Sequence, residues 1–216
     1  MTRALRPMLD RRHLVLGASA LFVAGCSGIQ LLPTPMTAQL YVLRPQLMTP
    51  MGTPVRWRLA VGTPDAPASL DTERIALTRS ATTMDYFANA AWNDRVPLLI
   101  ERLLVQAFEQ SGRIMAVTRD TAATENDYLL QSEIRDFEAR YESPDGAPQI
   151  VVAIQARLAR MPQREIVGTL NATQQAQASG NNLDAIVLAF NQASAAALTQ
   201  IVSWALASPA PPPSPG

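Results

Sequence analysis

Two stretches of the chain repeat their hydrophobic residues every three or four positions, which is the spacing of an amphipathic helix. The first covers residues 94–112, where Asp94 is placed to cap the N-terminus, Pro97 falls in the first turn and Gly112 ends the pattern. The second covers residues 183–207 and follows a Gly-Asn-Asn turn sequence. The sequence therefore predicts two helices, each with one buried face.

Apolar and polar residues alternate in several other stretches, which predicts strands with one buried face. Three long strands are expected at residues 128–141, 150–159 and 166–172, joined by turn sequences of hairpin length. Shorter strands are expected to complete the sheet at 40–43, 55–61, 74–78, 83–87 and 114–118. The predicted fold class is α+β, a mainly antiparallel β-sheet packed by two amphipathic helices. The polar pattern of 128–141 predicts an edge strand, open to pairing with another subunit in a homo-oligomer.

The first 25 residues have the pattern of an export signal. Four arginines precede an apolar run at residues 14–24, which is shorter than the roughly 20 residues that a membrane-spanning helix needs. Small residues then lead into Cys26, as in a bacterial lipobox, where the cysteine is lipidated and becomes the new N-terminus. We therefore predict lipid attachment at Cys26 and stable membrane anchoring through its acyl chains. The alternative is an ordinary secretory signal in which this cysteine has no role.

These features divide the chain into four parts. Residues 1–25 are the signal peptide, 26–39 a lipidated tether, 40–207 the folded domain and 208–216 a proline-rich tail that is expected to be disordered. Ser27 stands where enterobacterial lipoproteins of the inner membrane typically have Asp. The prediction therefore favours the periplasmic face of the outer membrane over the inner membrane.

The distribution of reactive side chains argues against catalysis. The chain has one His and one Cys, His13 and Cys26, so no imidazole or thiol follows residue 26. This excludes from the folded domain a Ser-His-Asp triad, a Cys-His pair, a zinc site of Cys and His, and a disulfide. We expect no catalytic residue, no metal site and no cofactor. Asp71, Glu73 and Asp85 could form the acid–base pair of a hydrolase, but solvated acids near arginines are the simpler interpretation.

The charge balance bears on the kind of partner. The chain has 18 arginines, no lysine and 18 acids, and loss of the signal peptide, with four arginines and one acid, would leave a net charge of −3. Such a chain is poorly suited to bind nucleic acid or an anionic membrane through charge. Protein partners are expected instead. The candidate binding residues are Arg56 and Arg58, at polar positions of a strand, and Trp92, in a loop-like segment before the first helix.

Three short strings carry a resemblance to a known family. They are Tyr-Val-Leu at 41–43 behind the lipobox, Leu-Asp-Thr-Glu-Arg-Ile-Ala-Leu at 70–77, and Trp-Asn-Asp-Arg-Val-Pro at 92–97 within the segment 86–99. Over roughly residues 40–205 the chain resembles the ABC-type transport auxiliary lipoprotein family. That family includes the lipoprotein of the paraquat-inducible intermembrane transport system.

The resemblance implies a function as well as a family. It implies a non-catalytic envelope lipoprotein that works with an ABC permease, its ATPase and an MCE-domain protein. Such systems are thought to move phospholipids or other hydrophobic molecules between the inner and outer membranes. The family has no established catalytic residues, so none is carried over to this chain. The alternative is an assembly or pilot lipoprotein of another outer-membrane machine, which would share the lipobox and the tether.

Overall fold

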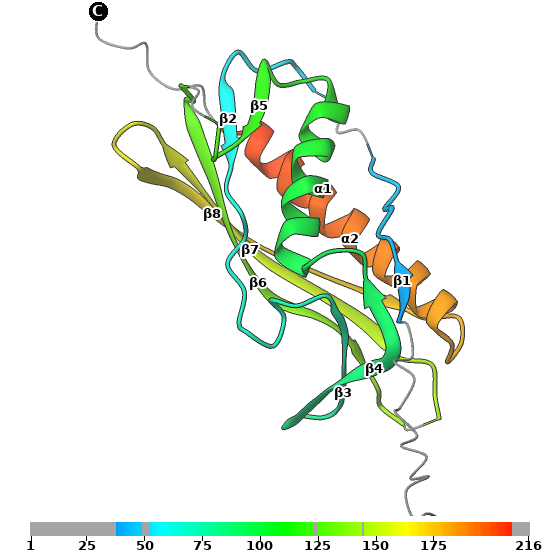
Figure 1. Cartoon of the computed structure of the whole chain (residues 1–216). Coiled ribbons are helices and arrows are strands. Elements are labelled where there is room, and N and C mark those ends of the chain that lie inside the picture. Colours follow the sequence, from blue (N-terminus) through cyan, green and yellow to red (C-terminus); the bar gives the residue numbers. More distant parts are fainter. Residues whose placement is uncertain (1–37, 49–51, 123–124, 144, 209–216) are drawn as a thin grey trace, which may run out of the picture. The chain divides into compact units, whose positions relative to one another are not determined.

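Eight strands and two helices make up the part of the chain that the computed structural model describes, residues 38–48, 52–122, 125–143 and 145–208 (Figure 1). In chain order they are β1 (Gln39–Tyr41), β2 (Arg58–Val61), β3 (Arg74–Ser80), β4 (Thr83–Trp92), α1 (Val96–Ser111), β5 (Ala116–Arg119), β6 (Tyr128–Arg140), β7 (Gln149–Arg160), β8 (Glu165–Gln177) and α2 (Leu183–Leu206). The signal peptide, Cys26 and nearly all of the tether and the proline-rich tail lie outside these residues, so the predictions for them stay predictions.

Strand β6 lies at the centre of the sheet because neighbouring strands pair with both of its edges. On one edge it forms a long antiparallel hairpin with β7, which in turn pairs with β8. On the other edge two short strands run parallel to β6, with β2 at residues 128–130 and β3 at residues 138–140. Beyond these, β5 pairs with β2, β4 with β3, and β1 with β4. The sheet therefore divides into two arms on one side of β6.

This topology changes two expectations. The α+β class is confirmed, but four of the seven strand pairings among the described residues are parallel, so the sheet is mixed rather than mainly antiparallel. The strand predicted at 128–141 is central rather than at the edge, because the short parallel strands cover the edge that its hairpin leaves open. Among the described strands, the long free edge belongs to β8, which pairs only with β7.

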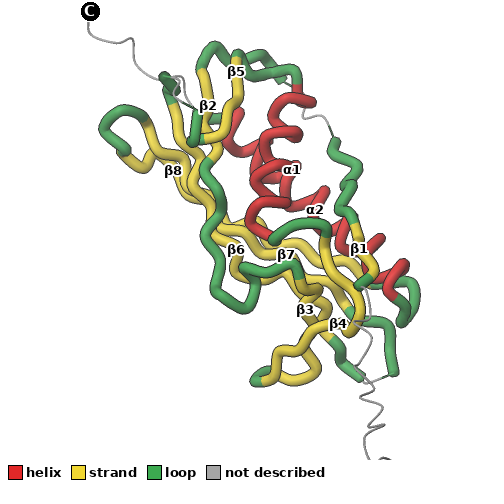
Figure 2. The backbone as a smooth tube through the Cα atoms, viewed as in Figure 1, coloured by secondary structure: helices red, strands yellow, loops and turns green. Residues whose placement is uncertain are grey.

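Both helices pack on one face of the sheet (Figure 2). The two faces of β7 show why. Ile150, Val152 and Ile154 point into the core and are almost completely buried, whereas Arg157 points to the opposite face and is exposed. The alternation predicted at 150–159 is confirmed in part: its apolar set is the surface on which the helices pack, but Val151 and Ala159 on the opposite face are buried as well.

The helix ends follow the sequence signals with one exception. Gly112 ends α1 in the left-handed conformation, at φ 61°, and Asn182 starts α2 by accepting a hydrogen bond from the Ala185 N–H (3.0 Å). The N-cap of α1 is Arg95, without a side-chain hydrogen bond, so the predicted cap by Asp94 is wrong. The carboxylate of Asp94 instead accepts a hydrogen bond from the N–H of Arg95 (2.8 Å).

Helix α2 is long and apolar enough, by length and composition, to cross a membrane. The same features are typical of a core helix, and most of α2 is buried against β7, β8 and α1. Its approach to β8 depends on a glycine. A Cβ atom on Gly168 would lie 3.1 Å from the ring of Trp204, which is tighter than an ordinary contact.

Three aromatic rings connect the sheet to α2. Trp92, at the end of β4, packs edge-on against Phe190 of α2 and Phe137 of β6, with ring centroids 5.1 and 5.9 Å away. Its side chain is 0% exposed, so the prediction of Trp92 as a partner-binding residue is wrong. The segment that looked like a loop is the end of a strand, where Trp92 pairs with Tyr41 of β1 and its side chain turns into the core.

Replacing Trp92 with Ala should lower the free energy of unfolding by about 3–5 kcal/mol, because the cavity would lie between two other buried rings. Urea denaturation of an unlipidated Cys26→Ser protein measures this loss. Leu188→Ala is the control, since Leu188 is a 61% exposed residue of α2 and its removal should change stability by less than about 0.5 kcal/mol. Equal losses in the two variants would contradict the aromatic packing.

Candidate functional site

The face of β6, β7 and β8 that the helices leave open carries the polar positions of these strands. The strand register places Glu133 of β6 beside Gln155 of β7, and Gln155 beside Asn171 of β8. Arg157 lies two residues further along β7 and therefore on the same face. The alternation of the sequence predicts that these positions are polar, whereas their grouping into one row depends on the register.

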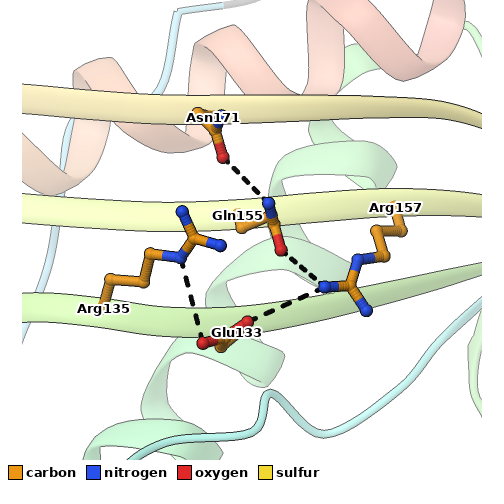
Figure 3. A network of polar contacts seen from close by, with 5 residues as sticks. All are labelled: Glu133, Arg135, Gln155, Arg157 and Asn171. Atoms are coloured by element: carbon orange, nitrogen blue, oxygen red, sulfur yellow. Dashed lines mark hydrogen bonds and ion pairs between the residues drawn. The ribbon is translucent and has the colours of Figure 1, made fainter.

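These side chains form a network across three strands (Figure 3). The amide of Gln155 donates to Asn171 Oδ1 (3.1 Å) and accepts from Arg157 Nη2 (2.7 Å). Glu133 lies between two arginines, with Arg157 Nη2 and Arg135 Nε each 3.9 Å from one of its oxygens. The three charged side chains are all about half exposed. Ion pairs of this length and exposure contribute little to stability, so the groups stay accessible to a partner.

Arg135 joins this face because of an irregularity in β6. The register of the β6–β7 hairpin shifts between Ile134 and Asp136, so Arg135 is an extra residue of β6 at a β-bulge. A bulge re-aims the side chain that it inserts, and here it directs Arg135 toward Glu133 (Figure 3). The apolar and polar pattern of the sequence did not predict this shift.

A hollow of about 390 Å³ opens beside the network, and Glu133, Gln155 and Arg157 form part of its lining. It lies where the chain after β2 follows the edge of β6. In this stretch the Gly62 N–H donates to the Leu130 carbonyl (2.9 Å), and Asp65 exchanges backbone hydrogen bonds with β6 (2.8 and 2.9 Å). The hollow therefore lies between the ends of β2 and β5 and the neighbouring parts of β6 and β7.

Glu101 reaches the hollow from α1 and is buried, with 4% of its surface exposed. One carboxylate oxygen accepts a hydrogen bond from Thr63 Oγ1 (2.6 Å), and the other lies 3.3 Å from Arg119 Nε. The pairing with an arginine and a hydroxyl compensates the cost of burying the charge. The sequence pattern missed this residue, since Glu101 lies next to the apolar stripe of α1 and resembles any polar helix position.

The hollow is suited to binding through hydrogen bonds and charge. Asp65, Glu101 and Asp120 line it together with Arg157 and Arg164, so both signs of charge are present. Lining of this kind favours a polar or zwitterionic surface over a hydrocarbon chain. Within the described ranges, no group of three or more His, Cys, Asp or Glu side chains is arranged to hold a metal ion.

The two arginines predicted to bind a partner lie at one end of β2. Arg56 and Arg58 are exposed on either side of Trp57, which is buried against Tyr128. The predicted alternation is therefore confirmed for residues 56–59, but β2 begins only at Arg58 and Ala60 is buried as well. Arg58 lies on the same face of the sheet as Ala60 and thus on the open face, but neither arginine lines the hollow beside Glu133.

The acids considered as a hydrolase pair lie outside the hollow. Asp71 forms an ion pair with Arg95, so its partner is the residue before α1 rather than an arginine of the neighbouring strand. Glu73 and Asp85 are exposed. The structure therefore does not bring these three acids into the hollow beside Glu133, whose carboxylates come from other elements.

A second charged group lies at the far end of β6, at Arg140. Burial tends to lower the pKa of Arg140, but a hydrogen bond to Glu138 (2.6 Å) and the charges of Asp136 (2.7 Å) and Glu138 outweigh it and raise the pKa. Glu138 is buried, at 5% exposed. The ion pairs of Arg140 are therefore short and partly buried, whereas those around Glu133 are long and exposed.

Comparison with known families provides the context for this surface. A family model for the ABC-type transport auxiliary lipoprotein component matches residues 39–202, from β1 almost to the end of α2. The chain belongs to this family. The auxiliary domain is thus the α+β unit described above, and membership makes the protein a lipoprotein that is anchored to a membrane of the cell envelope.

Two solved structures and one curated protein are similar to this auxiliary lipoprotein. A crystal structure of a Xanthomonas campestris protein is 28% identical, covers 78% of this chain and 95% of its own, and superimposes with a TM-score of 0.73. A second solved structure, of an uncharacterized protein, is 16% identical and shares the fold over 78% of this chain and 99% of its own (TM-score 0.62). An uncharacterized protein of Bradyrhizobium diazoefficiens is 27% identical over 170 residues, which are 76% of this chain and 44% of the relative. The chain thus spans less than half the length of this curated relative.

A double-mutant cycle can test whether the Glu133 network is needed for stability. For Glu133→Gln and Arg157→Gln we expect a coupling below about 0.5 kcal/mol in urea denaturation, because the pair is long and exposed. The matched cycle is Glu138→Gln with Arg140→Gln, where a short bond to a buried carboxylate should give about 1 kcal/mol or more. Equal couplings in the two cycles would show that the Glu133 network is structural.

Proposed function

We propose that this auxiliary lipoprotein is a non-catalytic component of an ABC/MCE-type envelope transport system. The system would move phospholipid or other hydrophobic molecules between the inner and outer membranes. The observation that carries the proposal is the family match, which covers residues 39–202 and therefore nearly all of the described domain. The partners would be an MCE-domain protein and the ABC permease and ATPase of the same system.

The open face of the sheet is the surface that we assign to the protein partner. It presents Glu133, Arg135 and Arg157 with little internal stabilisation, so a partner can form new ion pairs there at small cost. Arg58, the first residue of β2, extends the same face, and Arg56 is exposed two residues before it. Arginine is enriched at protein interfaces because its planar head makes several hydrogen bonds at once.

Purification of the tagged, lipidated protein from detergent-solubilised envelopes tests this assignment. We expect mass spectrometry to find an MCE-domain protein, a permease and an ATPase enriched with it. The variants Arg157→Glu and Arg58→Glu should lower this recovery about tenfold, the effect of losing about 1.4 kcal/mol of binding free energy. Glu109→Arg, at an exposed position of α1, is the charge-reversal control and should leave recovery unchanged.

Other results of this purification would contradict the proposal. Enrichment of a secretin or a lipopolysaccharide-export protein would favour the pilot lipoprotein instead. An isolated monomer whose deletion leaves outer-membrane permeability and lipid balance unchanged would remove the transport function altogether. If both arginine variants recover the partners as well as the unaltered protein does, the partners are correct but the interface lies on another surface.

Anchoring through Cys26 is a separate part of the proposal. The variant Cys26→Ala should release the protein from the membrane fraction, because the acyl chains supply the hydrophobic contact. Ser27→Ala, which keeps the cysteine, is the control. Density-gradient separation should find the unchanged protein with the outer membrane. Its recovery with the inner membrane would contradict the proposed location, and membrane retention of Cys26→Ala would contradict lipidation as the anchor.

A further inference from the structure

The solvent side of α2 differs from the usual surface of a helix. Asp184, in the first turn, is the single charged residue of the whole helix. An amphipathic surface helix normally carries charged residues on its exposed side. On α2 the exposed positions instead include Leu188, which is 61% exposed. After its first turn the helix therefore presents an uncharged surface, in which the apolar Leu188 lies beside polar residues such as Gln192.

A hollow of about 550 Å³ runs along this surface, between α2 and residues 44–48. These residues follow β1 beside the helix, and the backbone N–H of Arg44 holds them there by donating to Asn191 Oδ1 (2.6 Å). The volume lies within the range of roughly 300–1,000 Å³ that is usual for small-molecule sites. We call this hollow the α2 groove.

Most of the exposed surface of the α2 groove is apolar, and Gln46, Asn191, Gln192 and Thr199 also line it. Met48, 71% exposed, and Leu188 contribute the large side chains, and Ala195 and Ala196 of α2 leave the space between them. Methionine is flexible and adapts to ligands of irregular shape. Exposed apolar surface in a concave site is typical of ligand binding. The chemistry of the walls therefore suits a hydrocarbon chain.

The lining of the α2 groove includes one positively charged side chain. Arg44 is the charged residue among those that line it, and the residue is exposed. A guanidinium forms strong, two-pronged hydrogen bonds with phosphate oxygens. An apolar groove with a cation beside it is complementary to an amphiphile that has a hydrocarbon tail and an anionic head.

The length of the tether limits how far the α2 groove can lie from a membrane anchor at Cys26. The first described residue, Ala38, lies twelve positions after Cys26, and an extended chain of that length spans at most about 40 Å. Residues 38–48 then lead directly to the groove (Figure 1). If Cys26 is the anchor, the groove lies within reach of the surrounding phospholipids, which are the most abundant amphiphiles there.

We propose that the α2 groove binds one acyl chain of an anionic phospholipid, with the phosphate at Arg44. This inference rests on the proposed function, since it gives the anchored domain a direct contact with the transported class of molecule. Leu188 and Met48 hold the tail, and Arg44 selects the charged head. The polar hollow beside Glu133 remains the surface for protein, so the two sites lie on different parts of the fold.

Lipid transfer to the unlipidated protein tests the inference. The full mature chain carrying Cys26→Ser is incubated with vesicles of phosphatidylglycerol and phosphatidylethanolamine in equal parts, separated from them, and analysed for bound lipid. We expect about one phospholipid per chain, enriched in phosphatidylglycerol. Leu188→Gln and Met48→Gln should each weaken binding about tenfold, equivalent to about 1.4 kcal/mol. Arg44→Gln should reduce the enrichment in phosphatidylglycerol.

Two controls separate the groove from apolar surface in general and from loss of folding. Met115→Gln changes a methionine of similar exposure, at 64%, outside the lining of the groove and should bind lipid like the unchanged protein. Circular dichroism should show an unaltered fold in all variants, because the altered side chains are exposed. A loss of lipid in Met115→Gln equal to that in Leu188→Gln would overturn the site.

Further outcomes identify a different occupant. The inference is overturned if the Cys26→Ser protein with an unaltered groove carries no more lipid than its Leu188→Gln variant. If the groove variants bind lipid normally but lose self-association in sedimentation, the groove binds a second copy. If lipid binds to Cys26→Ser but not to the lipidated protein, the groove holds the protein's own acyl chain. Co-purification of the MCE partner does not depend on this assay, so failure of the groove and failure of the proposed function are distinguishable.

Discussion

The pairing of β6 on both of its edges is the constraint on which the rest of the structure depends. One edge is satisfied by a local hairpin with β7, and the other by β2 and β3, which cover its two ends. Between those ends, among the described residues, Asp65 forms an isolated bridge to β6. The polar hollow lies beside this stretch, next to the ends of β2 and β5, and α1 directs Glu101 into it. The candidate site thus depends on how β2 and the chain that follows it pair with β6.

Local sequence patterns were sufficient to predict the helices and strands, but not which strands lie next to each other in the sheet. The two helices and the β6–β8 hairpins follow from residue spacing, because each involves contacts between residues that are close in the chain. The parallel pairings of β2 and β3 with β6 join residues about 60 to 70 positions apart, and no local pattern encodes them. Trp92 is an example of a wrong prediction that results from this limit. Its buried environment comes from β1 and α2, so its own neighbourhood resembled a loop.

The candidate site shows the same division. Arg56 and Arg58 were predicted as exposed because alternation alone determines which face a strand residue occupies. The Glu133 network depends on register and Arg135 on a bulge, both of which are set by partner strands. Glu101 belongs to the site because of where α1 packs. The sequence thus predicted polar faces, while the assembly of side chains into a site required the three-dimensional pairing.

The sharing of β6 also has a consequence for the order in which the chain can fold. The segments that close the open edge of β6 come first in the sequence, and the strand that they need comes later. During synthesis the N-terminal half therefore has no sheet to join until β6 and its hairpins have emerged. The C-terminal hairpins and α2 pack largely on one another, so they are able to form before the N-terminal half joins them. Until β6 and its hairpins have formed, the strand edges of the N-terminal half are unpaired and exposed to other chains.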